Sequence, residues 1–368
     1  MTAAQYIGNK SFEVVAGSEI GPGPGEVRLD VGFVGICGND MHIYHGVMDQ
    51  RVGPPQVIGH EMSGVIAEIG EGVEGFEVGE RVVVRPLDYC GECPACDAGH
   101  SHICHNLKFM GSDSPGALQS SWTVKSRTLH KLPDNVTMEQ GALIEPLSVA
   151  CHDVTRSRLS AGEKAVVLGG GPIGQLIAQV AKGIGADVII SEVSDVRREF
   201  AENSGIRTVN PAEEDLNAVV QEWTGGKGAD VVFEVTGVVP AVETMTEVAA
   251  ARGRICMVAI HAEAPPVNLF HFFWKELEMV GARVYEAADF DQAIAMVANG
   301  DLDLEPFITS INTIEDIATA FYRKLMIDPL GDDYWLYDFV VEPGGSNGSV
   351  VPQLVVKPPP AQAALVRP

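Results

Sequence analysis

Four cysteines lie close together in the chain, at Cys90, Cys93, Cys96 and Cys104. The spacing C-x2-C-x2-C-x7-C lets four thiolates converge from one loop on a tetrahedral ion. Four thiolates leave no open coordination position, so the pattern predicts a structural zinc site. The alternatives are an iron–sulfur cluster or a disulfide-rich knot, which the composition and context of the chain favour less.

A second set of possible metal ligands is spread over three segments. A catalytic zinc needs three protein ligands and one open position, and the candidates are Cys37, His60, Glu61 and Glu145. A lone cysteine is usually a small buried hydrophobe, and a lone His-Glu pair usually makes an ordinary polar contact. Glu145, however, lies in the apolar run Leu-Ile-Glu-Pro-Leu, where a carboxylate needs a metal or a hydrogen-bonded partner. Together the four residues predict a catalytic zinc site, with Glu61 or Glu145 as the third protein ligand.

A glycine-rich turn provides the third chemical signal. Gly169, Gly171 and Gly174 form G-x-G-x-x-G directly after an apolar run and at the start of a helical stretch. In that context the backbone can approach a pyrophosphate at the helix N-terminus. The predicted cofactor-binding turn therefore includes Pro172 and Ile173, which lie between the second and third glycines.

Glu192 ends the next apolar run, about 20 residues after the turn. A carboxylate there accepts hydrogen bonds from the adenine ribose hydroxyls and repels a 2′-phosphate, so it predicts NAD rather than NADP. Arg197 and Arg198 follow within a few residues and favour NADP, unless they are solvated on the following helix.

Two kinds of domain are expected to position the metal ligands and the glycine turn. From residue 12 to about 128, short β-type runs separated by Gly/Pro-rich turns predict a mostly antiparallel β domain. From residue 164 to about 284, apolar strands alternate with helical stretches, which predicts a parallel, doubly wound sheet and an α/β fold class. The expected strands of that sheet are Ala165–Leu168, Asp187–Ser191, Val231–Phe233, Arg254–Ala259 and Met279–Ala282. Helices at 289–299 and 314–325 are expected to return the chain to the first domain.

The composition excludes several other classes of function. A formal net charge of −25 and the lack of a local Lys/Arg cluster disfavour nucleic-acid binding. No apolar run approaches the ~20 residues needed to span a bilayer, and the N-terminus does not resemble a signal peptide. An odd number of cysteines, seven, suits metal binding in a reducing compartment. We therefore expect a cytoplasmic protein that binds neither nucleic acid nor membrane.

The chain resembles the zinc-containing medium-chain alcohol dehydrogenases in four motifs and in their order. These motifs are Gly59-His60-Glu61, the four-cysteine loop, Ile144-Glu145-Pro146-Leu147-Ser148 and the glycine turn. The segment Ala142–Val149 is most similar to the sorbitol (L-iditol), polyol and butanediol dehydrogenases of that family. The resemblance covers about residues 12 to 325. It implies a GroES-like catalytic domain interrupted by a Rossmann domain, with the active site in the cleft between them. The expected ranges are 1–150 for the catalytic domain, 151–287 for the NAD-binding domain, 288–325 for the return and 326–368 for an atypical, partly flexible C-terminal segment.

The resemblance also implies roles for single residues. Cys37, His60 and Glu61 would bind the catalytic zinc, and Glu145 would be a further ligand or would hold the zinc-bound water. Asp40 would orient His60. Thr236, Val258 and Ile260, which follow two strands of the sheet, would line the nicotinamide.

Two features depart from the family pattern. Asn39 stands where relatives commonly carry a serine or threonine that relays the substrate proton, so the proton would leave through zinc-bound water with Glu145 or through His42. His42 and Tyr44 could also contact the substrate, within a pocket shaped by residues 41–56. From Met326 onward no match to the family is seen, and Gly344–Ser349 and Pro352–Pro368 are predicted to form a flexible tail.

The resulting hypothesis is a homodimeric or homotetrameric enzyme with two zinc ions per subunit. It would transfer a hydride from a secondary alcohol, namely a polyol, sugar alcohol or diol, to NAD and release a ketone. A threonine or cyclitol dehydrogenase of the same family is the alternative. A non-catalytic zinc- and nucleotide-binding protein is the alternative of another class.

Overall fold

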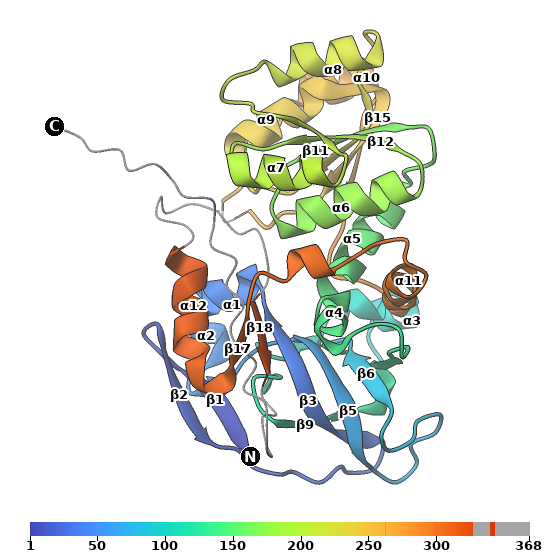
Figure 1. Ribbon diagram of the computed structural model, residues 1–368. Helices are drawn as coiled ribbons and strands as arrows, with labels where there is room; N and C mark the ends of the chain where they lie inside the picture. The colour runs from blue at the N-terminus through green and yellow to red at the C-terminus, as the bar shows by residue number, and fades with distance from the viewer. Residues whose placement is uncertain (262, 327–338, 343–368) are drawn as a thin grey trace, which may run out of the picture.

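The computed structural model of the protein describes residues 1–261, 263–326 and 339–342. The chain forms two lobes, with helix α5 (Ile144–Ser157) lying between them (Figure 1). The lower lobe in Figure 1 contains both ends of the described chain, and the upper lobe is inserted between them. None of the described helices is both long enough and apolar enough to cross a membrane.

The lower lobe is built around a largely antiparallel sheet in the order β10-β6-β5-β3-β18-β17, with β9 also paired to β3. Its longest strands have the alternating burial expected of a sheet with one face on a core. Leu29, Val34 and Ile66 on these strands share that core with Tyr6 and Phe321. The strands are β3 (Glu26–Ile36), β5 (Glu61–Ile69), β6 (Arg81–Val84), β9 (Ser121–Lys125), β10 (Leu129–Lys131), β17 (Ile311–Thr313) and β18 (Phe339–Glu342).

Smaller elements complete the lower lobe. A second sheet has the order β2-β1-β4, and a two-stranded sheet joins β7 and β8. Their bounds are β1 (Thr2–Gly8), β2 (Ser11–Ala16), β4 (Gln56–Val57), β7 (Leu87–Asp88) and β8 (Lys108–Phe109). The helices are α1 (Gly38–Tyr44), α2 (Asp49–Val52), α3 (Pro94–Asp97), α4 (Met138–Ala142) and α12 (Ile317–Met326), with 3₁₀ turns at Ser101–Ile103, Ser126–Thr128, Glu305–Phe307 and Ile314–Asp316.

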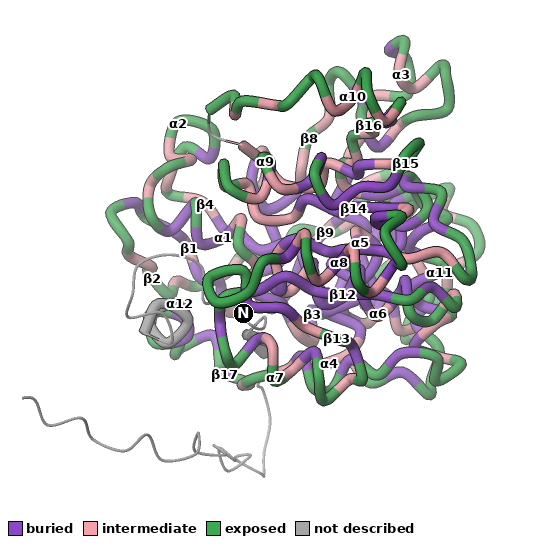
Figure 2. The backbone as a smooth tube through the Cα atoms, turned by 90° about the horizontal axis from the view of Figure 1, so that it is seen from above, coloured by how far each residue is buried: buried purple, intermediate pink, exposed green. Residues whose placement is uncertain are grey.

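The upper lobe is a doubly wound parallel sheet in the order β13-β12-β11-β14-β15-β16. In β11, Ala165 and Val167 belong to the core on one face, whereas Val166 and Leu168 belong to the core on the other. Because helices cover both faces, the central strands are largely buried, as Figure 2 shows for β12 and β14. The strands are β11 (Lys164–Leu168), β12 (Asp187–Ser191), β13 (Arg207–Val209), β14 (Ala229–Glu234), β15 (Ala249–Met257) and β16 (Glu278–Gly281). The helices are α6 (Pro172–Gly183), α7 (Asp195–Asn203), α8 (Leu216–Thr224), α9 (Val239–Val248), α10 (Leu269–Lys275) and α11 (Ala287–Ala298).

The predicted α/β class is confirmed, with a largely antiparallel β lobe and a doubly wound parallel sheet. The strand predicted at Asp187–Ser191 has those same bounds, and the others overlap the observed strands. One element was not anticipated: residues 339–342 form β18, which inserts between β3 and β17. The two segments expected to be a flexible tail, 344–349 and 352–368, lie outside the described residues.

Candidate active site

The end of β3 and the start of β5 bring three possible metal ligands together. Cys37 directly follows β3 and caps α1, so that its Sγ accepts a hydrogen bond from the backbone N–H of Asn39 at 3.2 Å. Glu61 begins β5, and the antiparallel register places it opposite Gly35, two residues before Cys37. His60 Nε2 consequently lies 3.1 Å from Cys37 Sγ, and possible ligand atoms of Cys37, His60 and Glu61 all lie within 4.8 Å of one another.

Gly35 makes room for the Glu61 carboxylate. A Cβ atom at this position would lie 2.3 Å from Glu61 Oε2 and 3.1 Å from its Cβ. Any other residue would therefore push the carboxylate away from Cys37 and His60. The backbone thus forms a cradle that fits a buried carboxylate as the third ligand.

The charges around His60 suit a cation. His60 and Asp40 are both buried, with His60 Nδ1 3.5 Å from Asp40 Oδ1, while the other Asp40 oxygen accepts the Cys37 backbone N–H. Burial opposes a charged imidazole, but the carboxylates of Asp40, Glu145 and Glu61 outweigh it and raise the pKa of His60 to about 10. A thiol, an imidazole and a carboxylate in a negative field are a donor set that zinc binds well.

Glu145 lies in the first turn of α5 and is buried. Its carboxylate accepts a hydrogen bond from the hydroxyl of Tyr285, four residues after the end of β16. Burial and the Glu145 charge raise the pKa of Tyr285 well above its ordinary value, which keeps this hydroxyl a donor. The charge of Glu145 therefore raises the pKa of His60, and the same carboxylate accepts the hydrogen bond from Tyr285. Sequence reasoning missed Tyr285 because a lone tyrosine between a strand and a helix has no distinctive spacing.

Asn39, which replaces the relay hydroxyl of the family, and His42, one of the two alternative proton routes, have different surroundings. Asn39 donates from Nδ2 to the buried hydroxyl of Ser112 at 3.1 Å, whereas His42 lies on the exposed face of α1. Tyr44, expected as a possible substrate contact, is buried in the core of the lower lobe against Phe12 and Phe321. Ser112 was not predicted, and it supplies the hydroxyl that position 39 lacks.

The four-cysteine loop forms a second cluster. Sγ–Sγ distances are 3.6 Å for Cys93–Cys96, 3.8 Å for Cys93–Cys104 and 3.4 Å for Cys90–Cys104. A tetrahedral ion with Zn–S bonds of ~2.3 Å requires sulfur atoms about 3.8 Å apart. Backbone N–H groups of Cys96 and His105 lower the pKa of Cys93 to about 6, which favours the thiolate that binds metal. All seven cysteines lie among the described residues and none forms a disulfide.

The glycine turn has the geometry of a phosphate-binding turn. Gly169 has φ +104°, and a Cβ at Gly174 would lie 2.0 Å from the Gly169 carbonyl oxygen, so both positions exclude a side chain. A Cβ at Gly171 would meet no atom within 4 Å. Gly171 caps α6, and Pro172 is its first residue, so the open face of the turn coincides with the helix N-terminus.

Glu192 is buried at the end of β12, beside this turn. Its carboxylate accepts N–H bonds from Gly170 at 2.7 Å and Ser194 at 2.8 Å. Arg197 is also buried, with Nη1 3.5 Å from Glu192 Oε2. Arg198 donates to the carbonyls of Glu192 and Val193 and pairs with Asp195. Both arginines therefore have partners within the protein.

A buried glutamate organises the other strand ends. Glu234 ends β14, and its Oε1 accepts hydrogen bonds from the backbone and hydroxyl of Thr236 at 2.9 and 2.5 Å and from the Gly237 N–H at 3.0 Å. Its Oε2 lies 3.1 Å from His261 Nε2. Val258 is half-buried, whereas Ile260 is 95% exposed. Glu234 thus fixes the two segments predicted to line the nicotinamide, a role that the sequence pattern did not reveal.

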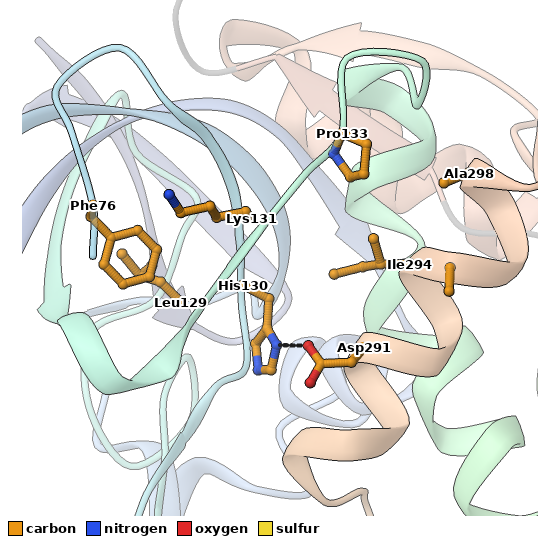
Figure 3. Close-up of a pocket in the computed structure, with 9 residues that line it drawn as sticks. Phe76, Leu129, His130, Lys131, Pro133, Asp291, Ile294 and Ala298 are labelled. Carbon is orange, nitrogen blue, oxygen red and sulfur yellow. Dashed lines mark hydrogen bonds and ion pairs between the residues drawn. The ribbon is translucent and has the colours of Figure 1, made fainter. Parts of the chain in front are cut away.

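A surface hollow lies elsewhere, between β10 and α11 (Figure 3). His130 Nδ1 and Asp291 Oδ1 are 2.8 Å apart within it, and Phe76, Pro133 and Ile294 contribute to its lining. It contains no residue of either ligand cluster, so we do not assign the chemistry to it.

Comparison with known proteins gives two family matches. Residues 23–134 match the alcohol dehydrogenase GroES-like domain, and residues 172–299 match the zinc-binding dehydrogenase family.

Three similar proteins extend over most of the chain. The 2-dehydro-3-deoxy-L-galactonate 5-dehydrogenase of Pseudoalteromonas atlantica is 71% identical over 321 residues, which cover 87% of this chain and 94% of that protein. A sorbitol dehydrogenase of Halalkalibacterium halodurans is 34% identical, over 88% of this chain and 97% of that protein. The structure of 2R,3R-butanediol dehydrogenase from Bacillus subtilis has a TM-score of 0.83 at 30% identity, covering 93% of this chain and 99% of that chain.

Proposed function

The chain belongs to the zinc-containing medium-chain alcohol dehydrogenase family, and on that premise we propose that it oxidises a secondary hydroxyl of a sugar acid to a ketone with NAD. The observation that carries the proposal is the link between the two lobes at the ligand cluster. Tyr285, just beyond the last strand of the parallel sheet, donates to Glu145, whose charge acts on His60. The cluster therefore lies beside the carboxyl end of the sheet, where this fold binds its cofactor.

Cys37, His60 and Glu61 would hold the catalytic zinc, and Cys90, Cys93, Cys96 and Cys104 the structural one. A zinc ion at the first site would supply the positive charge that lowers the pKa of a substrate hydroxyl. Asp40 orients His60, and Tyr285 orients Glu145 beside it. Glu145 would then lie near a zinc ion bound by His60, as a further ligand or a partner of zinc-bound water. Hydrogen bonds from Asn39 to Ser112 fix the loop next to Cys37.

The choice of NAD rests on Glu192. Its carboxylate is fixed by two backbone N–H groups at the place where the adenine ribose binds in this fold. Arg197 and Arg198 are already engaged with Glu192, Asp195 and backbone carbonyls, so neither is free to recognise a 2′-phosphate. A kinetic comparison of the two cofactors tests this point: kcat/KM should be much higher with NAD, and a preference for NADP would contradict it.

The proposed substrate class, a sugar acid, differs from the class predicted from sequence. That prediction was a polyol, sugar alcohol or diol, and relatives named for sorbitol and butanediol support it at 34% and 30% identity. The relative named for a sugar acid is 71% identical, which favours an acidic substrate. A neutral polyol or diol is the second candidate.

We also propose a homo-oligomer located in the cytoplasm. The seven free thiols suit a reducing compartment. Helix α10 and the edge strand β16 expose a continuous run of large apolar side chains, which is typical of a protein interface. These are Leu269, Phe270, Phe273, Trp274 and Met279, each at least half exposed, and we call them the α10 patch.

The experiment is a measurement of NADH formation with a substrate panel, combined with zinc analysis. The panel contains 2-dehydro-3-deoxy-galactonate, sorbitol, a butanediol and threonine. We expect the sugar acid to react fastest and the zinc content to fall from two ions per chain to one in Cys37→Ser, with loss of activity. Turnover of neutral alcohols alone would favour the second candidate. One zinc in the wild type and no turnover on any alcohol would support a non-catalytic binding protein instead.

A further inference from the structure

The buried carboxylate of Glu234 joins two segments at the carboxyl edge of the parallel sheet. Its Oε1 accepts the backbone N–H groups of Thr236 and Gly237, which follow β14. Its Oε2 lies 3.1 Å from Nε2 of His261, four residues after the end of β15. The Glu234 side chain has no exposed surface, and the His261 side chain is 15% exposed. Because a buried carboxylate is costly unless it is paired and hydrogen-bonded, His261 completes a set of partners that the segment after β14 supplies only in part.

The two segments also touch each other. Gly237 has φ +74°, and a Cβ atom there would lie 3.1 Å from the carbonyl oxygen of Ile260. On its other side the segment after β14 reaches the glycine turn, since a Cβ at Gly169 would lie 2.7 Å from Cγ2 of Thr236. The glycine turn and the segments after β14 and β15 therefore form one packed unit, and Glu234 holds two of its three parts.

This unit lies on the nicotinamide side of the expected cofactor site. Strand β11, which leads into the glycine turn, is flanked by β12 on one side and by β14 and β15 on the other. A dinucleotide lies across the carboxyl ends of such a sheet. Since the proposed place of the adenine ribose is Glu192, at the end of β12, the nicotinamide half would lie over β14 and β15. Ile260 is 95% exposed there and offers an apolar surface to one face of an aromatic ring.

The contact between His261 and Glu234 is suited to fix geometry rather than to add stability. An ionised carboxylate only accepts hydrogen bonds, so Nε2 of His261 must carry the proton that it donates to Glu234. This hydrogen bond fixes both the tautomer and the orientation of the ring. A buried acid–base pair adds little net stability, because the desolvation of the two groups offsets their attraction. The pair does, however, hold two strand ends at a fixed spacing.

We propose that Glu234 and His261 are positioning residues for the nicotinamide half of the cofactor. By holding the segment after β15 against the segment after β14, the pair fixes the surface on which the nicotinamide rests. The adenine half, which would be bound at Glu192 on the other side of the glycine turn, does not depend on this contact. The inference rests on the proposed function only in that the protein binds a nicotinamide cofactor, and it is independent of the substrate.

The test compares the binding of NADH and of ADP to the full-length, zinc-loaded protein by calorimetric titration. ADP lacks the nicotinamide and its ribose, so it reports on the adenine half and on the folding of the upper lobe. His261→Ala removes the contact with Glu234, whereas His261→Gln keeps an N–H donor. The matched control is His130→Ala, because His130 Nδ1 lies 2.8 Å from Asp291 and its side chain is 10% exposed, in the hollow of Figure 3.

We expect His261→Ala to weaken NADH binding by roughly 10- to 100-fold, the range of a lost charge-assisted hydrogen bond, and to leave ADP binding unchanged. His261→Gln should retain most of the NADH affinity, and His130→Ala should bind both ligands as the wild type does. Unchanged NADH binding in His261→Ala would overturn the proposal. An equal loss of NADH and ADP binding would overturn it too, because it would show that His261 supports the whole nucleotide site. NADH binding that is no stronger in His261→Gln than in His261→Ala would contradict the role of the hydrogen bond to Glu234.

The deuterium isotope effect on hydride transfer gives a second readout. The alcohol of the panel that reacts fastest is compared with the same alcohol carrying deuterium on its carbinol carbon. A misplaced nicotinamide slows hydride transfer itself. In His261→Ala we therefore expect a lower kcat and an isotope effect on kcat at least as large as in the wild type. A lower kcat with a smaller isotope effect would contradict the positioning role, because another step would then be the slow one.

The binding measurement separates this inference from the proposed reaction. If no alcohol of the panel is oxidised, a selective loss of NADH binding in His261→Ala would still support the positioning role. If a sugar acid is oxidised and NADH binding in His261→Ala is unchanged, the proposed function stands and this inference fails. A wild type that binds neither NADH nor NADPH would overturn both.

Discussion

Gly35 illustrates how a residue without a side chain can determine a metal site. The Glu61 carboxylate occupies the space where a Cβ at position 35 would be. We predict that Gly35→Ala displaces Glu61 and lowers the catalytic zinc content, with a stability loss of about 1–3 kcal/mol from overpacking. Zinc analysis should show about one ion lost per chain.

The matched control for this substitution is Gly38→Ala. Gly38 lies three residues further along, and a Cβ there would meet no atom within 4 Å. Its zinc content should therefore equal that of the wild type. Full zinc content in Gly35→Ala would show that Glu61 is not a ligand and would favour Glu145.

At this scale the sequence predicted which residues cluster at the candidate site but not the residues that support them. Cys37 and His60 could be recognised because each lies next to a glycine, and Glu61 because it directly follows His60. Tyr285, Ser112 and Glu234 could not, because each acts through one contact to a segment distant in sequence. No spacing rule encodes a contact of that kind.

Among the elements, helix α5 carries two buried acidic residues, Glu145 and Asp153. It places Glu145 at the candidate active site and Asp153 in its interior, where neither Asp153 oxygen has a partner among the described residues. Burial and the nearby charge of Asp289 raise the pKa of Asp153 well above its ordinary value of 3.8. The folded state therefore favours the protonated acid.

We predict that Asp153→Asn stabilises the protein at neutral pH by about 1–3 kcal/mol, because it removes the cost of burying an acid. A raised folded-state pKa means that wild-type stability is greatest below the ordinary pKa and falls as pH rises toward the folded-state pKa. The melting temperature of Asp153→Asn should therefore exceed that of the wild type by a margin that widens as pH rises from the ordinary carboxyl pKa of 3.8 toward neutral. Asp301→Asn, at an exposed aspartate, should show no such margin, and a constant margin in Asp153→Asn would contradict the argument.

The elements with strong periodicity were predictable. The strands of the parallel sheet are apolar runs between helical stretches, so their positions followed from pattern alone. β18 was not predicted, because a strand of four residues gains its stability from β3 and β17 on either side rather than from its own sequence. The same holds for the pairing of β4 with β1, which only the folded chain brings together.

At the scale of the whole molecule, the α10 patch gathers several exposed apolar side chains of the described residues. Trp274 is 71% exposed and Phe273 77% exposed, beside an edge strand with unpaired backbone groups. We predict that Phe273→Glu combined with Trp274→Glu converts the oligomer into monomers, because burying two new charges in the interface is unfavourable. Light scattering coupled to gel filtration measures the mass.

Val78→Glu serves as the control, since Val78 is a single exposed hydrophobe in the other lobe. It should leave the oligomer intact. A wild type that is already monomeric, or a double variant of unchanged mass, would contradict the assignment of the α10 patch as the interface.

The insertion of one lobe into the other also determines the order in which the protein can be completed. Gly35 is paired with Glu61 on one side and with Val340 on the other, so the strand leading to Cys37 lies between one of the earliest and one of the latest parts of the chain. During synthesis every proposed zinc ligand leaves the ribosome before the parallel sheet does, whereas β18 arrives after it. The six strands of the parallel sheet, β11 to β16, are consecutive in the chain, so this sheet can fold while translation continues. The thiol of Cys37 should therefore stay reduced until β18, the last strand among the described residues, pairs with β3.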